Sequence, residues 1–340
     1  MAFYLLWIII KIENMKNIVI ALSVLVLFSS CKVNDTSKMG STTKATTNLS
    51  QNNNWTLKYK TLAINGVNIA YREAGNPENP TIVLLHGFPA SSYQYRKVLQ
   101  QLADQFHLIA PDYPGFGNSD FPDAKTYQYT FDNIATTVNA FLEQKNINSY
   151  AIMIQDYGAP IGFRLATAHP ERITAIINQN GNAYEAGLGA AWKGIRALWK
   201  NRTKQTEEAL LPAFSLDGLK WQYTHGVRDI QTVDPDSYNL DYLRLSRPNA
   251  HAVNLDLFYD YQNNVKLYPK WQQYLRDNQP PLLIVWGKND AFFPESGAEA
   301  FKKDVKNIDY NIYDTGHFAL EEDGDAIIKK IRSFMRKLSK

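Results

Sequence analysis

The chain has only one cysteine among its 340 residues, so no disulfide can form within it. Its few histidines and the single cysteine show no spacing with acidic residues that is typical of a metal site. The sequence therefore predicts neither a bound metal nor a cofactor, and any chemistry is expected to come from ordinary side chains.

A strong excess of charge is also missing. The chain carries 36 basic and 33 acidic residues, a net charge of +3. A dedicated nucleic-acid-binding protein would show a concentrated basic face, so the composition argues against that class. Hydrophobic residues make up 45% of the chain, which is enough for a sizeable core and for one or two domains.

The single cysteine has an informative position near the N-terminus. Met15-Lys16-Asn17 precedes the apolar run 18–28, and Ser29-Ser30-Cys31 follows it. A positive start, an apolar core and small residues predict a secretory signal over 1–31, with Met15 as an alternative start. The cysteine resembles that of a bacterial lipobox, so Cys31 is the predicted lipid attachment. A plain cleaved signal, an N-terminal anchor and a buried structural cysteine are the alternatives.

The rest of the chain divides by composition and by rhythm. Residues 32–54 are mostly Ser, Thr and Asn and predict a flexible linker. Apolar strands alternate with amphipathic segments over 55–182 and again over 279–340, which predicts a mostly parallel α/β sheet flanked by helices. Residues 183–278 lose this rhythm, contain no apolar strand and are rich in Trp, Tyr and Leu, so we expect an inserted helical cap domain.

Residues 152–160 read as a short apolar strand followed by a tight turn and a helix. Asp156 lies at the tip of that turn, between Gln155 and Tyr157. This is the pattern of a nucleophile elbow, in which a sharp turn exposes one side chain and supplies a backbone N–H beside it. The usual residue there is Ser, so an aspartate predicts different chemistry.

Two further ionisable residues follow apolar strands. Asp290 ends the segment Trp286-Gly287-Lys288-Asn289-Asp290, and His317 lies in Thr315-Gly316-His317-Phe318. Because the carboxyl ends of parallel strands meet at one edge of a sheet, Asp156, Asp290 and His317 are expected in one site. Their order along the chain, nucleophile then acid then histidine, is that of α/β-hydrolases.

From Trp55 onward the sequence resembles α/β-hydrolase-fold enzymes of the epoxide hydrolase and haloalkane dehalogenase branch. The resemblance rests on the segments 86–89 (HGFP), 112–117 (DYPGFG), 155–158 (QDYG) and 316–318 (GHF), and on the Asp290 loop. It implies that Asp156 forms a covalent alkyl ester and that His317, held by Asp290, activates water to hydrolyse it. It also implies an oxyanion hole formed by the backbone N–H groups of Phe88 and Tyr157.

The same resemblance favours epoxides over haloalkanes. Dehalogenases of this branch hold the leaving halide with a Trp directly after the nucleophile and an Asn in the HGNP motif, where this chain has Tyr157 and Phe88. Epoxide hydrolases take a proton for the opening ring from cap tyrosines. A small, apolar and neutral substrate is expected.

One of those family tyrosines lies in a Tyr-Arg-Asn stretch, which Tyr261-Gln262-Asn263 matches except at its middle residue. For the second cap tyrosine, Tyr223 is favoured over Tyr238 and Tyr242. Haloalkane dehalogenation, another α/β-hydrolase activity and a non-catalytic ligand-binding homologue are the alternative functions.

Overall fold

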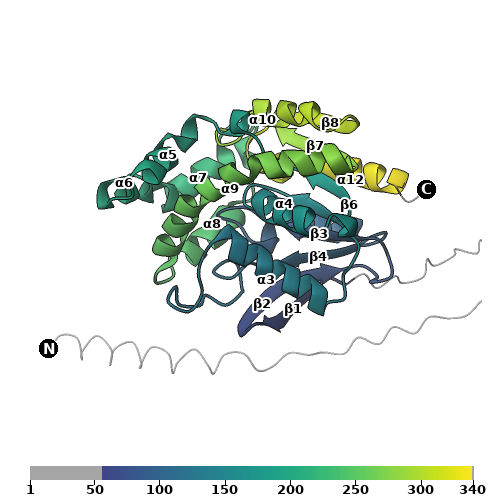
Figure 1. Ribbon diagram of the computed structural model, residues 1–340, viewed down its shortest axis with the longest axis horizontal. Coiled ribbons are helices and arrows are strands. Elements are labelled where there is room, and N and C mark those ends of the chain that lie inside the picture. Colours follow the sequence, from purple (N-terminus) through teal and green to yellow (C-terminus); the bar gives the residue numbers. More distant parts are fainter. Residues whose placement is uncertain (1–55, 339–340) are drawn as a thin grey trace, which may run out of the picture. The chain divides into compact units, whose positions relative to one another are not determined.

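A computed structural model describes residues 56–338, so Cys31 and the predicted signal and linker lie outside the described residues. One sheet organises this part of the chain, in the order β1-β2-β4-β3-β5-β6-β7-β8. Strands β3 to β8 run parallel, and β2 joins β4 antiparallel (Figure 1). The strands are β1 (Lys58–Ile64), β2 (Val67–Ala74), β3 (Thr81–Leu85), β4 (His107–Pro111), β5 (Tyr150–Ile154), β6 (Ile173–Asn178), β7 (Leu282–Gly287) and β8 (Ile308–Tyr313).

Helices connect the strands and cover both faces of the sheet. They are α2 (Arg96–Leu102), α3 (Phe131–Gln144), α4 (Gly158–Ala168), α5 (Lys193–Lys200), α6 (Lys204–Glu208), α7 (Leu216–Thr224), α8 (Pro235–Leu245), α9 (Ala250–Asn278), α10 (Glu295–Ala300), α11 (Ala319–Glu322) and α12 (Gly324–Leu338). Short 3₁₀ turns extend several of them, including Ser92–Tyr95, which precedes α2 where the sequence suggests continuous α-helix. Among residues 56–338, no helix is both long and apolar enough to span a membrane.

Alternation along the buried strands builds two cores. In β5, Ile152 and Ile154 point to one face of the sheet, while Ala151 and Met153 point to the other. The first face packs against α3, α4 and α9, and the second packs against α2 and α12. Because both faces are covered, the central strands are apolar throughout, as expected for a parallel sheet.

The hairpin at the edge of the sheet follows from two residues. Ile64 pairs with Val67 across a two-residue turn in which Asn65 has φ +50° and Gly66 has φ +84°. A type I′ turn needs positive φ at both positions, and Asn-Gly is the pair that tolerates it best. This turn fixes the register of β1 on β2.

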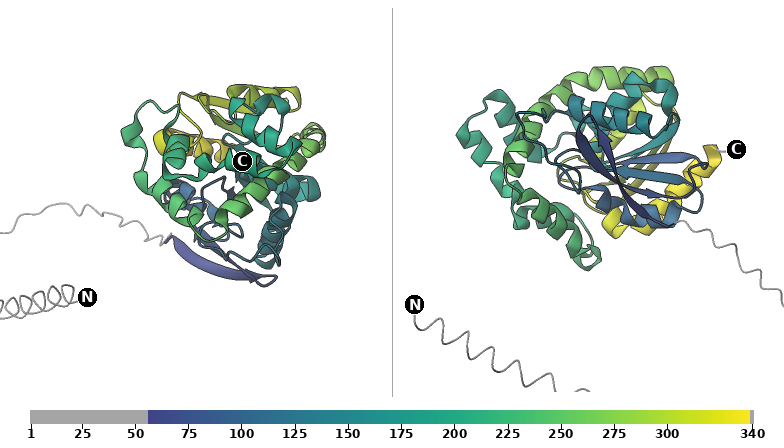
Figure 2. Two further views of the ribbon diagram at one scale, coloured as in Figure 1. Left: turned by 90° about the vertical axis from the view of Figure 1, so that its left-hand side faces the viewer. Right: turned by 90° about the horizontal axis from the view of Figure 1, so that it is seen from below.

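Helices α5 to α9 lie between β6 and β7 in the sequence. Figures 1 and 2 show α5 to α8 gathered beyond one end of the sheet, on the side away from the C-terminus. Phe214 and Phe258 from this segment contact Phe88, which follows the carboxyl end of β3, with ring centroids 5.8 and 5.1 Å apart. The helical segment therefore covers the edge of the sheet where the predicted site residues lie.

Candidate active site

The turn after β5 has the geometry that exposes a nucleophile. Asp156 has φ +48°, a left-handed conformation that is uncommon for residues other than glycine and that its surroundings maintain. The constraint comes from close packing, because a Cβ added at Gly158 would lie 2.0 Å from the carbonyl oxygen of Leu85. The turn leads directly into α4, so the side chain of Asp156 projects beyond the sheet.

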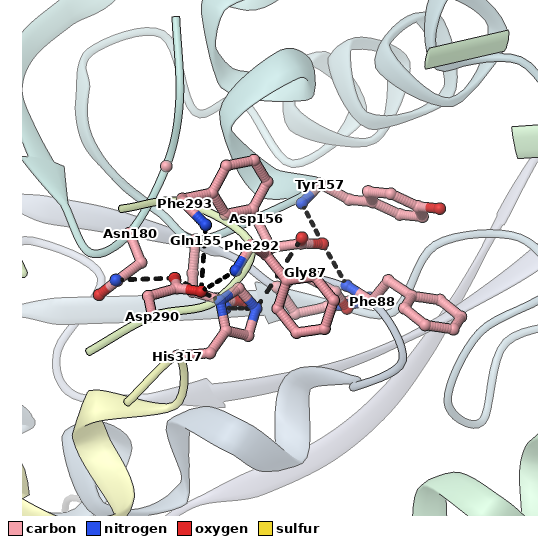
Figure 3. Close-up of polar contacts among 12 residues, drawn as sticks. Gly87, Phe88, Gln155, Asp156, Tyr157, Asn180, Asp290, Phe292, Phe293 and His317 are labelled. Carbon is pink, nitrogen blue, oxygen red and sulfur yellow. Dashed lines mark hydrogen bonds and ion pairs between the residues drawn. The ribbon is translucent and has the colours of Figure 1, made fainter. Parts of the chain in front are cut away.

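The two oxygens of the Asp156 carboxylate have different surroundings. Oδ1 accepts hydrogen bonds from the backbone N–H groups of Phe88, at 2.7 Å, and Tyr157, at 2.6 Å. Oδ2 lies 3.9 Å from Nε2 of His317. Figure 3 shows the carboxylate between the two N–H donors, with the rings of Phe88 and Tyr157 turned away from His317. Oδ2 is therefore the oxygen that is free to attack, and Oδ1 occupies an oxyanion hole.

His317 is held by Asp290. Its Nδ1 lies 2.7 Å from Asp290 Oδ2. A carboxylate can only accept, so Nδ1 carries the proton and Nε2, the ring nitrogen nearer Asp156, carries the lone pair. This is the tautomer that a general base needs.

Asp290 is itself fixed by other groups. Its Oδ1 accepts from the backbone N–H groups of Phe292 and Phe293, and its Oδ2 accepts from Asn180 Nδ2 at 2.9 Å. Asn180 also bridges to Gly287 at the end of β7, through both its amide nitrogen and its amide oxygen. The sequence analysis missed Asn180. The polar run 178–182 directly after an apolar strand was the signal that could have indicated it.

Burial and neighbouring charges shift the pKa values of Asp156 and His317. Asp156 is 8% exposed and His317 is 3% exposed. Burial raises the pKa of Asp156 to about 6, although the charge of His317 and the two N–H groups oppose the rise. Burial lowers the pKa of His317, but the charge and hydrogen bond of Asp290 outweigh it, so the net shift is upward.

The pKa of Asp156 gives a testable pH dependence. The attacking group is the carboxylate, so protonation of Asp156 removes the nucleophile. We expect the rate of enzyme alkylation, measured in a single turnover, to fall as the pH drops through about 6. A rate that stays constant from pH 7 to pH 5 would contradict this assignment of the nucleophile.

The other predicted residues occupy two different environments. Tyr261, on α9, is 1% exposed, and its hydroxyl lies close to that of Tyr268. Its ring lies 6.3 Å from that of Tyr157 and 5.5 Å from that of Phe131. The hydroxyl of Tyr223 instead donates to Asp241 at 2.6 Å, and its ring stacks on Phe318 at 3.8 Å. The structure thus brings Tyr261 to the aromatic wall beside the elbow but engages the Tyr223 hydroxyl elsewhere.

His86 has a supporting position under the oxyanion turn. Its ring is fully buried and stacks on Tyr113, with centroids 3.9 Å apart. Nδ1 donates to the carbonyl of Gly87, and Nε2 accepts from the N–H of Tyr113 at 3.4 Å. Burial lowers its pKa to about 4, so it stays neutral and ties the loops after β3 and β4 together.

Ionisable groups suited to a metal do not gather here. Within residues 56–338, no cluster of three or more His, Cys, Asp or Glu is arranged to hold a metal ion. The arrangement instead offers a carboxylate nucleophile, an oxyanion hole and a histidine–carboxylate base, which suits two-step hydrolysis through a covalent ester.

Comparison with known proteins agrees with the fold. The sequence profile described as the alpha/beta hydrolase fold matches residues 80–324. An uncharacterized hydrolase of Saccharomyces cerevisiae is 46% identical over 272 residues, covering 79% of this chain and 93% of the yeast protein. The chain belongs to the alpha/beta hydrolase fold family, and by this similarity it is a hydrolase.

More distant similarities are to enzymes with different names. A cis-3-alkyl-4-alkyloxetan-2-one decarboxylase of Shewanella oneidensis is 27% identical and covers 81% of this chain and 87% of its own length. A haloalkane dehalogenase of Bradyrhizobium diazoefficiens is 36% identical, but over only 33% of this chain and 35% of that protein. The haloalkane dehalogenase DbeA from Bradyrhizobium elkani has the same fold, with a TM-score of 0.70 at 22% identity over 84% of this chain and 99% of DbeA.

Proposed function

We propose that the protein is an epoxide hydrolase that opens an apolar epoxide to a diol through an ester on Asp156. The single observation that carries the choice of epoxide is the position of Tyr261, a fully buried phenol whose ring packs beside Tyr157 of the elbow. Burial raises its pKa well above 10, and the neighbouring Tyr268 and the negative charge of Asp156 add to the rise. A phenol held protonated beside the nucleophile is suited to donate to a ring oxygen as it opens.

In the first step, Asp156 Oδ2 attacks a ring carbon of the epoxide. The new carbon–oxygen bond forms as the ring carbon–oxygen bond breaks, and the released oxygen takes the proton of Tyr261. In the second step, His317 Nε2 removes a proton from water, and the hydroxide adds to Cγ of Asp156. The N–H groups of Phe88 and Tyr157 stabilise the resulting oxyanion at Oδ1, each by about 3 kcal/mol. Collapse releases the diol as the proton on His317 goes to the leaving oxygen. The proton of the re-formed Asp156 carboxylic acid returns to the Tyr261 phenolate, which restores both groups.

The indole groups support an epoxide rather than a haloalkane. A halide leaving group needs N–H donors, but three of the indoles in the described residues use theirs on backbone carbonyls. Trp192 donates to Phe292, Trp199 to Phe258 and Trp286 to Phe293, at 3.0, 2.7 and 3.0 Å. The residue after the nucleophile, Tyr157, has no indole. No donor among these groups is free to hold a halide in the arrangement described.

The aromatic walls support a neutral, apolar substrate. Phe88, Phe214 and Phe258 pack together on one side of the oxyanion turn, and Phe131 and Tyr261 pack against Tyr157 on the other. None of these side chains carries a charge at pH 7. A charged substrate group would lose its hydration here without gaining a partner.

Removing the proposed acid tests this function. We expect Tyr261→Phe to lower the rate at which an epoxide alkylates Asp156 by at least about 100-fold. The matched control is Tyr223→Phe, which removes a hydroxyl bound to Asp241 and should change the rate by less than about 3-fold, while lowering the free energy of unfolding by about 1 kcal/mol. If Tyr261→Phe leaves the rate of Asp156 alkylation by the epoxide unchanged, Tyr261 is not the proton donor.

A substrate panel separates the alternatives. Terminal and internal epoxides, bromoalkanes, simple esters and a β-lactone would be offered to the wild-type protein, the β-lactone because the Shewanella relative is named for a four-membered oxygen ring. Epoxide turnover should exceed the others by kcat/KM. Halide release faster than diol formation would favour dehalogenation, and the absence of turnover on every substrate would favour a binding protein.

For localisation, we propose that the protein is exported and anchored through a lipid on Cys31. The proposal rests on the apolar run 18–28 and the small residues before the cysteine. Cys31→Ser should move the protein from the membrane fraction to the soluble fraction of cells that express it. If the variant stays in the membrane fraction, an N-terminal anchor holds it instead.

A further inference from the structure

The residue before the nucleophile contacts the catalytic base directly. Gln155 is fully buried between Asp156 and β5, and its Nε2 lies 2.7 Å from Nε2 of His317 (Figure 3). Since His317 Nδ1 donates to Asp290, Nε2 is the acceptor, and the Gln155 amide N–H donates to it. The resting site therefore has the lone pair of the base occupied by an amide.

This contact has to open during ester hydrolysis. The water that attacks the ester gives its proton to His317 Nε2, so it must occupy the position that the Gln155 N–H holds at rest. Protonated His317 also carries a hydrogen on Nε2, and an amide N–H cannot remain in contact with it. The Gln155 carboxamide must therefore turn in each catalytic cycle.

The other end of the same carboxamide is an unused acceptor. Gln155 Oε1 is buried and has no hydrogen-bond partner. It lies against Gly87, where an added Cβ would be 2.1 Å from Oε1 and 2.5 Å from the Cβ of Asp156. A buried oxygen without a partner loses its hydration and gains nothing in exchange, so its retention this close to the nucleophile needs an explanation.

We propose that Gln155 positions the hydrolytic water: its carboxamide turns so that Oε1 accepts one hydrogen of the water while His317 Nε2 accepts the other. A water with both hydrogens bound in this way directs an oxygen lone pair toward Cγ of Asp156. The proton then moves to His317 Nε2, the hydroxide bonds to Cγ, and the ester bond breaks as before. This inference rests on the covalent-ester function but on no particular leaving group.

The test separates the two chemical steps. Gln155→Met keeps a side chain of similar length but removes both the donor and the acceptor. We expect kcat to fall by about 10- to 100-fold because hydrolysis becomes slow. Because alkylation governs kcat/KM, that ratio should stay within about 3-fold of the wild type, and KM should fall with kcat. Mass spectrometry of the working enzyme should detect an accumulated Asp156 ester.

Two variants sharpen the result. Gln155→Glu supplies an acceptor but adds a negative charge beside His317, which raises the pKa of the base, so its hydrolysis should recover as the pH rises toward 9. Gln179→Met is the matched control, because Gln179 is equally buried and also has an unpaired Oε1, but it donates to the backbone oxygen of His317. Gln179→Met should not accumulate ester.

The outcomes are distinct. Equal losses in kcat and kcat/KM for Gln155→Met, or no loss in either, would overturn the water-positioning role. The proposed function fails separately, if His317→Gln forms no ester adduct with any epoxide or bromoalkane in the panel.

Discussion

Replacing His317 by Gln should leave an enzyme that alkylates Asp156 once and then stops. The attack by Oδ2 uses a group that is already ionised, so it does not need the base. Hydrolysis does need it, because His317 Nε2, 3.9 Å from Asp156 Oδ2, is the base that takes the proton of the attacking water. We expect turnover to fall by at least about 1,000-fold, with a stable mass increase equal to the whole epoxide.

The adduct can be located by peptide mapping. It should lie in the peptide that contains residues 155–158, and the double variant Asp156→Asn/His317→Gln should form none. His86→Gln is a suitable comparison, since His86 is equally buried but supports the loops after β3 and β4 without facing Asp156 Oδ2. An adduct on another residue would contradict the assignment of the nucleophile.

Asp156→Asn should abolish activity and stabilise the fold at the same time. The neutral amide cannot displace a ring oxygen, so no ester forms and turnover should fall by at least about 1,000-fold. The folded-state pKa of Asp156, about 6, lies above that of an unfolded aspartate. The folded state therefore disfavours the charged form, and this destabilisation is present above about pH 6 and lost as the pH falls toward 4.

The size of the stabilisation follows from the same shift. A raised pKa of this extent corresponds to about 3 kcal/mol at pH 7, which Asn would recover. Chemical denaturation at pH 7 should show that increase, and the difference from the wild type should shrink by pH 4. If Asp156→Asn loses activity and also has a lower free energy of unfolding, the substitution damages the fold. The destabilisation inferred from the raised pKa of Asp156 would then be contradicted.

Much of the fold could be predicted from local pattern. The strand, tight turn and helix over 152–160 appear where the sequence places them, because they depend on a short apolar run and on turn chemistry. The α/β-hydrolase fold class is confirmed.

The side chains that support the triad were harder to predict than the triad itself. Asp156, Asp290 and His317 each follow an apolar strand, so strand order alone predicts that they meet. The contacts of Gln155 with His317 and of Asn180 with Asp290 depend on side-chain directions across neighbouring loops, which no sequence period encodes. The direction of the Tyr223 hydroxyl could not be predicted for the same reason. It is set by packing of the ring on Phe318 and by a hydrogen bond to Asp241 on the next helix.

The covalent mechanism requires that the oxygen delivered to the substrate comes from Asp156. A single turnover in H₂¹⁸O, with enzyme in excess over epoxide, tests it directly. The account predicts a diol without ¹⁸O and a peptide over residues 155–158 that gains the label, because water attacks Cγ and Oδ2 leaves with the product. A first-turnover diol that carries ¹⁸O, with an unlabelled peptide, would mean that water attacks the epoxide directly and would contradict the covalent mechanism.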